Sequence, residues 1–263
     1  MRARIYTLIL TLLKTFSVNA QFDTSNIVYF DNMFRSEPDI EYAKFYGVPK
    51  KIRNNKYEVT FYTMKGQKFA TGEYESPKLN LREGRFVQYG FKGQIILSAH
   101  YHNNLMHGVF QTFHNNGMQA DSGQMARNYF IGLWKSWYPN GQLKDIKNYK
   151  LIGTVLTGIE GEYRSWDPKG KLIDSGYYKE GNRTGVWIEW KWDGEMRGFG
   201  GHKTDLPYDW ARYGALRTVG AYKKGYRDGD WKYYDTTGKL LYMRRYTRKE
   251  HDEDGEIILI KKD

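Results

Sequence analysis

The sequence predicts an all-β fold in which stacked β-hairpin repeats form an elongated antiparallel sheet, a single-sheet solenoid. Three observations lead to this prediction. A short spacing of glycine and aromatic residues recurs seven times. Dipeptides that suit tight turns, such as Asn140-Gly141, divide each copy into two strand-like runs. The composition, with 23 Tyr, 13 Phe, 8 Trp and 28 Gly in 263 residues, fits many short strands better than long helices.

The repeated unit begins with glycine, has aromatic slots two and five positions later, and closes with glycine at the ninth step. Aromatics fill 13 of the 14 slots in a chain that is 17% aromatic, so composition alone does not explain the pattern. A degenerate first copy reads Tyr57, Val59, Tyr62 and Gly66. The regular copies are Gly84, Phe86, Tyr89, Gly93; Gly108, Phe110, Phe113, Gly117; Gly132, Trp134, Trp137, Gly141; Gly161, Tyr163, Trp166, Gly170; Gly185, Trp187, Trp190, Gly194; and Gly229, Trp231, Tyr234, Gly238.

Each copy reads as one β-hairpin. The first run extends from the opening glycine through both aromatics, and the second follows the turn, as in residues 171–178. A lone hairpin is marginal in water, and stacking hairpins edge to edge gives every strand a partner. We expect a ladder of buried rings to be the main cohesive contribution.

The placement of the two aromatic slots has two solutions. They are three positions apart, so in a regular strand they face opposite sides of the sheet. Either both faces then carry an aromatic row, or a bulge near the turn brings the two rings to one face.

Three intervals between copies are longer than the common period of 24 residues. Extra residues fall around Ser76 to Lys78 and near Leu151 to Thr157. The longest addition, of twenty residues, is predicted near Gly198 to Arg217, because the usual second-strand glycine and tyrosine reappear as Gly220 and Tyr222.

The predicted organisation has four parts. Residues 1–20 have a basic start, an apolar run over 5–13 and small residues before Ala20, which predicts an export signal peptide cleaved after Ala20. Leader strands are expected in 21–56, the repeat array in 57–247, and a capping strand or tail in 248–263. The predicted address is therefore periplasmic or secreted. No later segment is apolar enough to cross a membrane.

The charge balance favours acidic partners or anionic surfaces. After removal of residues 1–20, 38 basic and 30 acidic residues remain, a net charge of +8. The basic residues are scattered through every repeat, so most are expected on a solvated face, and no nucleic acid is expected as a partner. The chain has no cysteine, which excludes disulfides and a lipid-modified terminal cysteine.

The repeats resemble the MORN-variant (MORN_2-type) repeat, whose pattern is close to G-x-W-x-x-Y-x-x-x-G-x-L. The best copies are residues 132–143 and 229–240. The resemblance covers about residues 57 to 247 and implies stacked hairpins with a binding or scaffolding role. Some bacterial members are similar to antitoxins that neutralise a partner toxin. No catalytic residues belong to the motif.

The insertion is the one irregular stretch in which residue types common at binding sites coincide. Its candidate binding residues, with one just before it, are Trp192, His202, Asp205, Tyr208, Asp209, Trp210 and Arg212. Loops on a rigid scaffold often carry function, and Trp, Tyr and Arg are favoured at interaction hot spots. The alternative is a cap that packs its own aromatics against the sheet.

Other candidate chemistry is weak. His100 and His102 share a strand face and form a possible metal pair with His114, but nothing fixes further ligands. Residues 252–256 resemble part of a calcium loop and depart from it after Asp254, so an acidic turn before a final strand at Glu256 to Lys261 is expected instead. No metal, cofactor or catalytic site is predicted.

These observations favour an exported, non-enzymatic repeat scaffold that binds a protein or an envelope component. A lipid-headgroup or polyanion binder is the second reading, from the net charge. An antitoxin-like neutraliser is the third. A carbohydrate site using Trp192 and Trp210, or a hydrolytic site using His202, Asp205 and Asp209, is the fourth.

Overall fold

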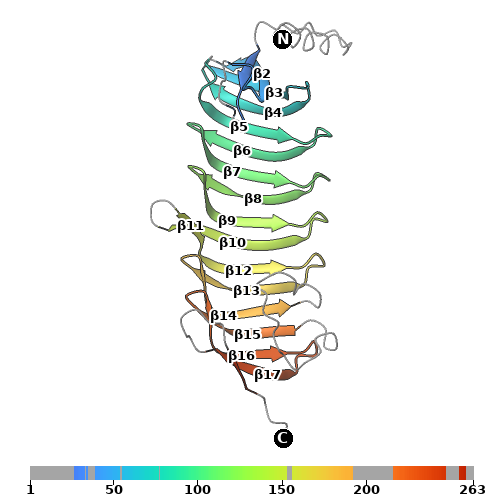
Figure 1. The fold of residues 1–263 in the computed structure, drawn as a ribbon, viewed down its shortest axis with the longest axis vertical. Coiled ribbons are helices and arrows are strands. Elements are labelled where there is room, and N and C mark those ends of the chain that lie inside the picture. Colours follow the sequence, from blue (N-terminus) through green and yellow to red (C-terminus); the bar gives the residue numbers. More distant parts are fainter. Residues whose placement is uncertain are drawn as a thin grey trace. The chain divides into compact units, whose positions relative to one another are not determined.

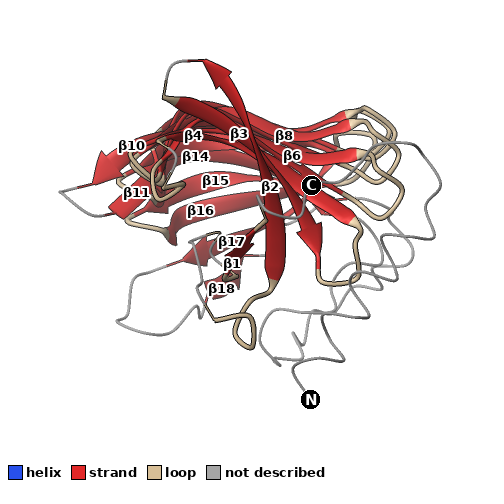
Figure 2. Cartoon of the chain, turned by 90° about the horizontal axis from the view of Figure 1, so that it is seen from above, coloured by secondary structure: helices blue, strands red, loops and turns tan. Residues whose placement is uncertain are grey.

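The computed structural model describes residues 27–32, 34, 39–53, 55–76, 78–152, 156–191, 216–246 and 255–258. All regular secondary structure in these ranges is β-strand (Figure 2), as the sequence predicts. The chain divides into two compact units, the first holding residues 1–118 and 125–128 and the second 119–124 and 129–263. The predicted signal peptide lies outside the described residues.

The first unit is an antiparallel sheet in which each strand pairs with the next along the chain (Figure 1). Its strands are β1 (Val28–Phe30), β2 (Phe45–Arg53), β3 (Lys56–Thr63), β4 (Lys68–Glu75), β5 (Arg82–Tyr89), β6 (Ile95–His102) and β7 (Leu105–Phe113). β8 (Gln119–Ala126) is divided between the units. β1 and β2 lie within residues 21–56, where leader strands are expected, and β3 coincides with the start of the degenerate first copy.

The second unit repeats the same hairpin order. Its strands are β9 (Tyr129–Trp137), β10 (Leu143–Ile152), β11 (Leu156–Ile159), β12 (Gly161–Trp166), β13 (Leu172–Lys179), β14 (Asn182–Lys191), β15 (Leu216–Lys223), β16 (Tyr226–Tyr234), β17 (Leu240–Tyr246) and β18 (Gly255–Ile258). β10 continues past the usual strand length and pairs with β11, which accounts for the extra residues near 151–157. β18 covers the start of the predicted final strand.

Both repeat glycines adopt backbone conformations that other residues rarely take. The closing glycine sits in the hairpin turn, as at Gly141 with φ of 82°, and its amide donates to the Tyr138 carbonyl. The opening glycine also has positive φ, as at Gly185 with 65°. A side chain at either position meets steric strain, which explains why the sequence keeps glycine at both.

The two aromatic slots face opposite sides of the sheet. Pairing of β14 with β15 runs without interruption from Gly185 to Lys191, so Trp187 and Trp190 alternate in the usual way. A bulge does occur beside the turn, but the extra residue belongs to the second strand of the hairpin, as with Ile173 between Leu172 and Asp174. The solution with an aromatic row on each face is therefore the one observed.

The first-slot rings form the core of the second unit. Trp187 and Trp231 are fully buried and belong to one cluster with Tyr233, Tyr242 and Tyr246. Tyr222 lies between the two indoles, with ring centroids 5.8 Å from Trp187 and 5.1 Å from Trp231, both edge to face. This confirms the predicted ring ladder within the unit.

A second-strand glycine makes room for each of these indoles. A Cβ built on Gly176 would lie 2.2 Å from the Trp187 ring, and one built on Gly220 would lie 2.2 Å from the Trp231 ring. Gly123 meets Trp134 at the same distance. In the first unit Ala99 takes this position, opposite the smaller ring of Phe110.

The first unit has its own core. Phe30, from the short β1, is fully buried against Phe61, with ring centroids 4.9 Å apart. Phe34 stacks on Phe45 and meets Phe86 edge to face. Leu79, in the longer connection between β4 and β5, is buried in the same cluster.

Candidate functional site

The predicted binding residues of the insertion lie outside the described residues. These are Trp192, His202, Asp205, Tyr208, Asp209, Trp210 and Arg212. The structure does show the strands that flank them. β14 ends at Lys191 and β15 begins at Leu216, one residue before the predicted end of the insertion, and Lys191 and Leu216 are paired. The insertion therefore leaves and re-enters the sheet at one strand pair.

A row of polar side chains crosses the second unit beside its aromatic core. Successive strand pairings join Ser136, Asp145, Ser165, Asp174, Glu189 and Thr218 on one face. All of them except Asp174 are buried. A buried polar row requires partners within the protein. We call these six residues the polar row.

Glu189 is the most heavily bonded member of the polar row. Its Oε1 accepts from Arg183 Nη1 at 2.6 Å and from the Tyr222 hydroxyl at 2.8 Å. Its Oε2 accepts from Arg227 Nη2 at 2.7 Å. The guanidinium carbons of Arg183 and Arg227 lie 4.2 Å and 4.1 Å above the Trp187 and Trp231 rings. The network thus joins β14, β15 and β16.

Burial and neighbouring groups oppose each other at Arg227. Burial disfavours the charged guanidinium, but Tyr233, Glu189 and Tyr246 favour it, so the pKa of Arg227 is raised above its ordinary value. At Tyr233, burial disfavours the charged phenolate and so raises the pKa of its hydroxyl. Arg227 therefore stays charged, and Glu189 is neutralised by two cations. This arrangement suits a structural ion network.

The second-slot aromatics on the opposite face pair with basic side chains. Lys171 Nζ lies 4.6 Å from the Trp190 ring centroid. The Arg217 guanidinium lies 4.5 Å from the Tyr234 ring centroid and 5.8 Å from that of Trp190. Cation–π contacts of this kind are partly desolvated and stabilise the outer surface. They account for part of the scattered positive charge.

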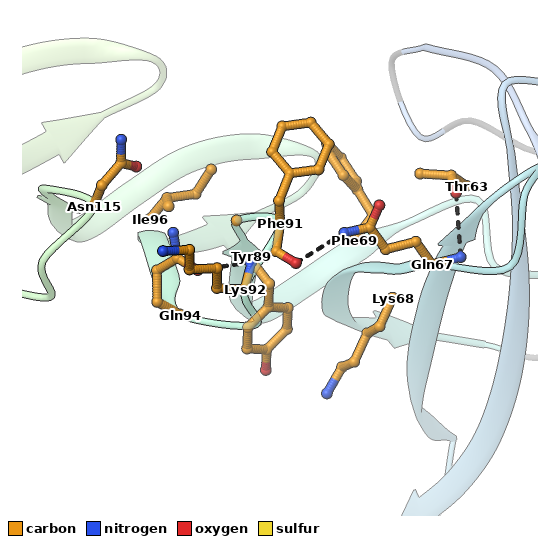
Figure 3. Close-up of a pocket in the computed structure, with 11 residues that line it drawn as sticks. Thr63, Gln67, Lys68, Phe69, Tyr89, Phe91, Lys92, Gln94, Ile96 and Asn115 are labelled. Carbon is orange, nitrogen blue, oxygen red and sulfur yellow. Dashed lines mark hydrogen bonds between the residues drawn. The ribbon is translucent and has the colours of Figure 1, made fainter.

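The hairpin turns of the first unit enclose an open cavity of about 480 Å³ (Figure 3). Its walls come from three turns, which follow β3, β5 and β7. We call it the turn pocket. Its apolar lining residues are Phe69, Tyr89, Phe91 and Ile96, and its polar ones include Gln67, Lys68, Lys92, Gln94 and Asn115.

Phe91 is the most unusual residue of the turn pocket. It stands at the tip of the β5–β6 turn with 93% of its surface exposed. The turn beneath it is fixed, because Gln67 Nε2 donates to the Phe91 carbonyl at 3.2 Å and Gln94 Oε1 accepts from the Lys92 amide at 3.1 Å. A single exposed aromatic is ordinary, but one held over a cavity is typical of a recognition surface.

The histidine metal hypothesis finds no support in the described residues. His102 Nδ1 lies 2.8 Å from Glu83 Oε1, and no group of three or more histidine, aspartate or glutamate side chains in the described ranges could hold a metal ion. Burial opposes ionisation of Glu83, but hydrogen bonds from His102 and the Asn103 amide hold the pKa of Glu83 below its ordinary value.

Fold and surface together define a class: an all-β repeat protein whose recurring spacing of glycine and aromatic residues serves hairpin turns and ring packing. Residues 131–151, 159–180 and 227–248 match the family model described as MORN repeat variant. These stretches correspond to the hairpins β9–β10, β12–β13 and β16–β17. The chain therefore contains MORN-variant repeats in these three hairpins. A comparison with curated proteins finds no match.

Sequence reasoning missed both the polar row and the turn pocket. The polar row had a signal, since its first-strand members follow the first aromatic slot by two residues, as in Trp134 and Ser136. The turn pocket also had one. Gly90-Phe91-Lys92-Gly93 is a turn with a large apolar residue where others carry Pro139, Pro168 or Thr236.

Proposed function

We propose that the chain is an exported, non-enzymatic repeat scaffold that binds a protein partner or an envelope component. The MORN-variant repeats support a scaffold for binding. The observation that carries the proposal is that some aromatic side chains are buried in packing while another is exposed. The first-slot tryptophans are buried in packing, whereas Phe91 is held almost fully exposed above a cavity. The framework is thus self-sufficient, and the exposed aromatic is available to a partner.

Export is part of the proposal and rests on residues 1–20 of the sequence. Among the described residues, no helix is long and apolar enough to span a membrane. Expression with the native leader in a bacterial host tests the address. We expect mass spectrometry of the envelope fraction to find a chain beginning at Gln21, and a chain that keeps Met1 and stays in the cytoplasm contradicts it.

Partner binding is tested by cross-linking pull-down from the envelope of the native host. We expect the intact chain to retain a partner. Replacing Trp192 and Trp210 by alanine tests the insertion as the binding element, and we expect loss of the partner with little change in thermal stability. An intact chain that retains no partner contradicts the scaffold proposal.

A lipid-headgroup or polyanion binder is the second candidate. The net charge of the chain favours it, and in the first unit Lys65 and Lys92 lie on turns while Lys68 begins β4. Attraction of this origin weakens steeply as salt rises. Cosedimentation with vesicles containing phosphatidylserine at low and high salt tests it, and binding that does not change with salt contradicts it.

An antitoxin-like role is a specific form of partner binding, suggested by the resemblance of the repeats. The test is co-expression with any toxic protein encoded beside this chain. Rescue of growth by the chain supports the role, and unchanged toxicity speaks against it.

A further inference from the structure

We propose that the turn pocket binds an acidic segment of a partner protein that carries a large apolar side chain. The inference rests on the proposed scaffold function and specifies one contact surface on the first unit and the chemistry that the partner presents there. Three properties of the turn pocket carry it, namely a preformed shape, an exposed aromatic at its rim, and a one-sided charge.

The shape is fixed before any partner arrives. Phe69 stacks on Phe45 with ring centroids 4.8 Å apart and planes within 17°, which holds one wall. The Tyr89 hydroxyl lies 3.4 Å from Thr71 Oγ1, which holds the Tyr89 side chain in place. A preformed cavity of about 480 Å³ falls in the size range of ligand pockets and loses little entropy on binding.

At the rim of the turn pocket, an exposed aromatic ring is surrounded by polar side chains. The large ring of Phe91 is already exposed to solvent, so no rearrangement is needed before a partner can contact it. Its turn is joined to the β3–β4 turn by the hydrogen bond from Gln67. Gln94 and Asn115 add amide groups at the lining. Aromatics with a polar surround dominate binding energy at protein interfaces, so an apolar partner residue beside Phe91 is the expected anchor.

The charge of the three turns is positive only. Residues 63–68, 89–95 and 113–119 contain Lys65, Lys68, Lys92 and no aspartate or glutamate. Lys68 Nζ lies 4.3 Å from the Tyr89 ring centroid, which places its charge at the pocket. By contrast, Asp167 and Asp235 occupy turns of the second unit. Charge complementarity therefore selects an acidic partner segment.

A protein segment suits this site better than a lipid surface. A membrane needs exposed apolar and basic groups but no cavity, whereas the turn pocket is a cavity with a mostly apolar lining and amide side chains among its polar residues. Figure 3 shows Gln67, Gln94 and Asn115 distributed around the pocket, with Phe91 extending from its turn.

The experiment selects peptides from a displayed random 12-residue library against the purified full chain. We expect enrichment of peptides that combine several Asp or Glu with one Phe, Trp, Leu or Ile. Phe91→Ser and the double variant Lys68→Glu with Lys92→Glu should each weaken the enriched peptides about 10-fold or more. Tyr177→Ser and Lys135→Glu, which alter exposed residues of the second unit, are the controls and should bind normally.

Unfolding is separated from loss of binding by thermal melts, which should coincide for all variants because the altered side chains are exposed. The inference is overturned if no acidic peptide is enriched, if the enriched peptides bind the pocket variants as well as the unaltered chain, or if the same substitutions abolish vesicle binding instead. A native partner that is retained equally by the pocket variants overturns the inference and leaves the scaffold proposal standing. An unaltered chain that selects acidic peptides at the pocket but retains no native partner contradicts only the scaffold proposal.

Discussion

At the residue scale, two indole rings of the second unit pack directly against glycine backbone. Trp187 covers Gly176, and Trp231 covers Gly220. The two residues of each pair lie eleven positions apart in the sequence, on adjacent strands. Gly176 and Gly220 do not have positive φ, so the backbone conformation does not require glycine there. Glycine is needed at these positions because a Cβ would collide with the indole ring.

Gly176→Ala should therefore destabilise the chain by about 1–3 kcal/mol through overpacking. Chemical denaturation followed by tryptophan fluorescence measures the effect. The cost should shrink when Trp187 is also replaced by Phe, since Ala99 already sits opposite Phe110 in the first unit. An equal cost in both backgrounds contradicts the steric explanation.

Asp235 provides a second test at this scale, through pH. The Thr237 hydroxyl, followed by the amides of Lys239 and Thr237, holds the pKa of Asp235 below its ordinary value of 3.8. A carboxylate with a lowered folded pKa stabilises the fold fully above its unfolded pKa, and this stabilisation is lost as pH falls through the folded pKa. Asp235→Asn should therefore lower the melting temperature at pH 7 and make less difference near pH 2. A difference that is the same at both values argues against the turn as its source.

At the scale of elements, the polar row links strands that the hairpins alone do not join. Glu189 accepts hydrogen bonds from β14, β15 and β16 at once, and Thr218 lies directly opposite it. Removal of one partner from a buried ion network leaves the others uncompensated. The network should therefore matter more to stability than exposed ion pairs of the same sheet.

Glu189→Gln should cost about 3 kcal/mol of unfolding free energy, because Arg227 and Arg183 then lose their counter-charge. Urea denaturation gives the number. Glu162→Gln is the matched control, since Glu162 pairs with Arg164 at the surface with about half of each side chain exposed, and it should change stability by less than about 1 kcal/mol. Similar costs at both sites show that burial does not set the value of the network.

At the scale of the whole molecule, stability is expected to be local. Repeat proteins are held by contacts between neighbouring repeats, so damage spreads over short distances. Each of the two units also has its own buried cluster. The turn pocket should therefore depend on the buried cluster of the first unit and not on that of the second.

Trp187→Ala tests this organisation. The cavity should remove about 3–5 kcal/mol of local stability. Amide hydrogen exchange should accelerate most in β13 to β16 and least in β3 to β5. Equal acceleration in all strands indicates one cooperative fold and contradicts the nearest-neighbour view.

Much of the fold followed from the spacing alone. A hairpin turn requires glycine, as at Gly141, and its buried face requires a ring at the first slot, as at Trp187. Both requirements are local, so they can be recognised in one sequence. The candidate site followed less well. The insertion residues stay a prediction, and the turn pocket was missed because Phe69, Phe91 and Asn115 lie on three different turns.

By itself, the sequence determined the class of fold, the hairpin boundaries and the repeat family, because each depends on short-range steric rules repeated many times. The tertiary structure alone decided that the aromatic slots face opposite sides, that Glu189 gathers two arginines, and that Phe91 stands over a cavity. Those facts depend on strand register and on which side chains meet across neighbouring strands, and a pattern read along one strand does not contain that information.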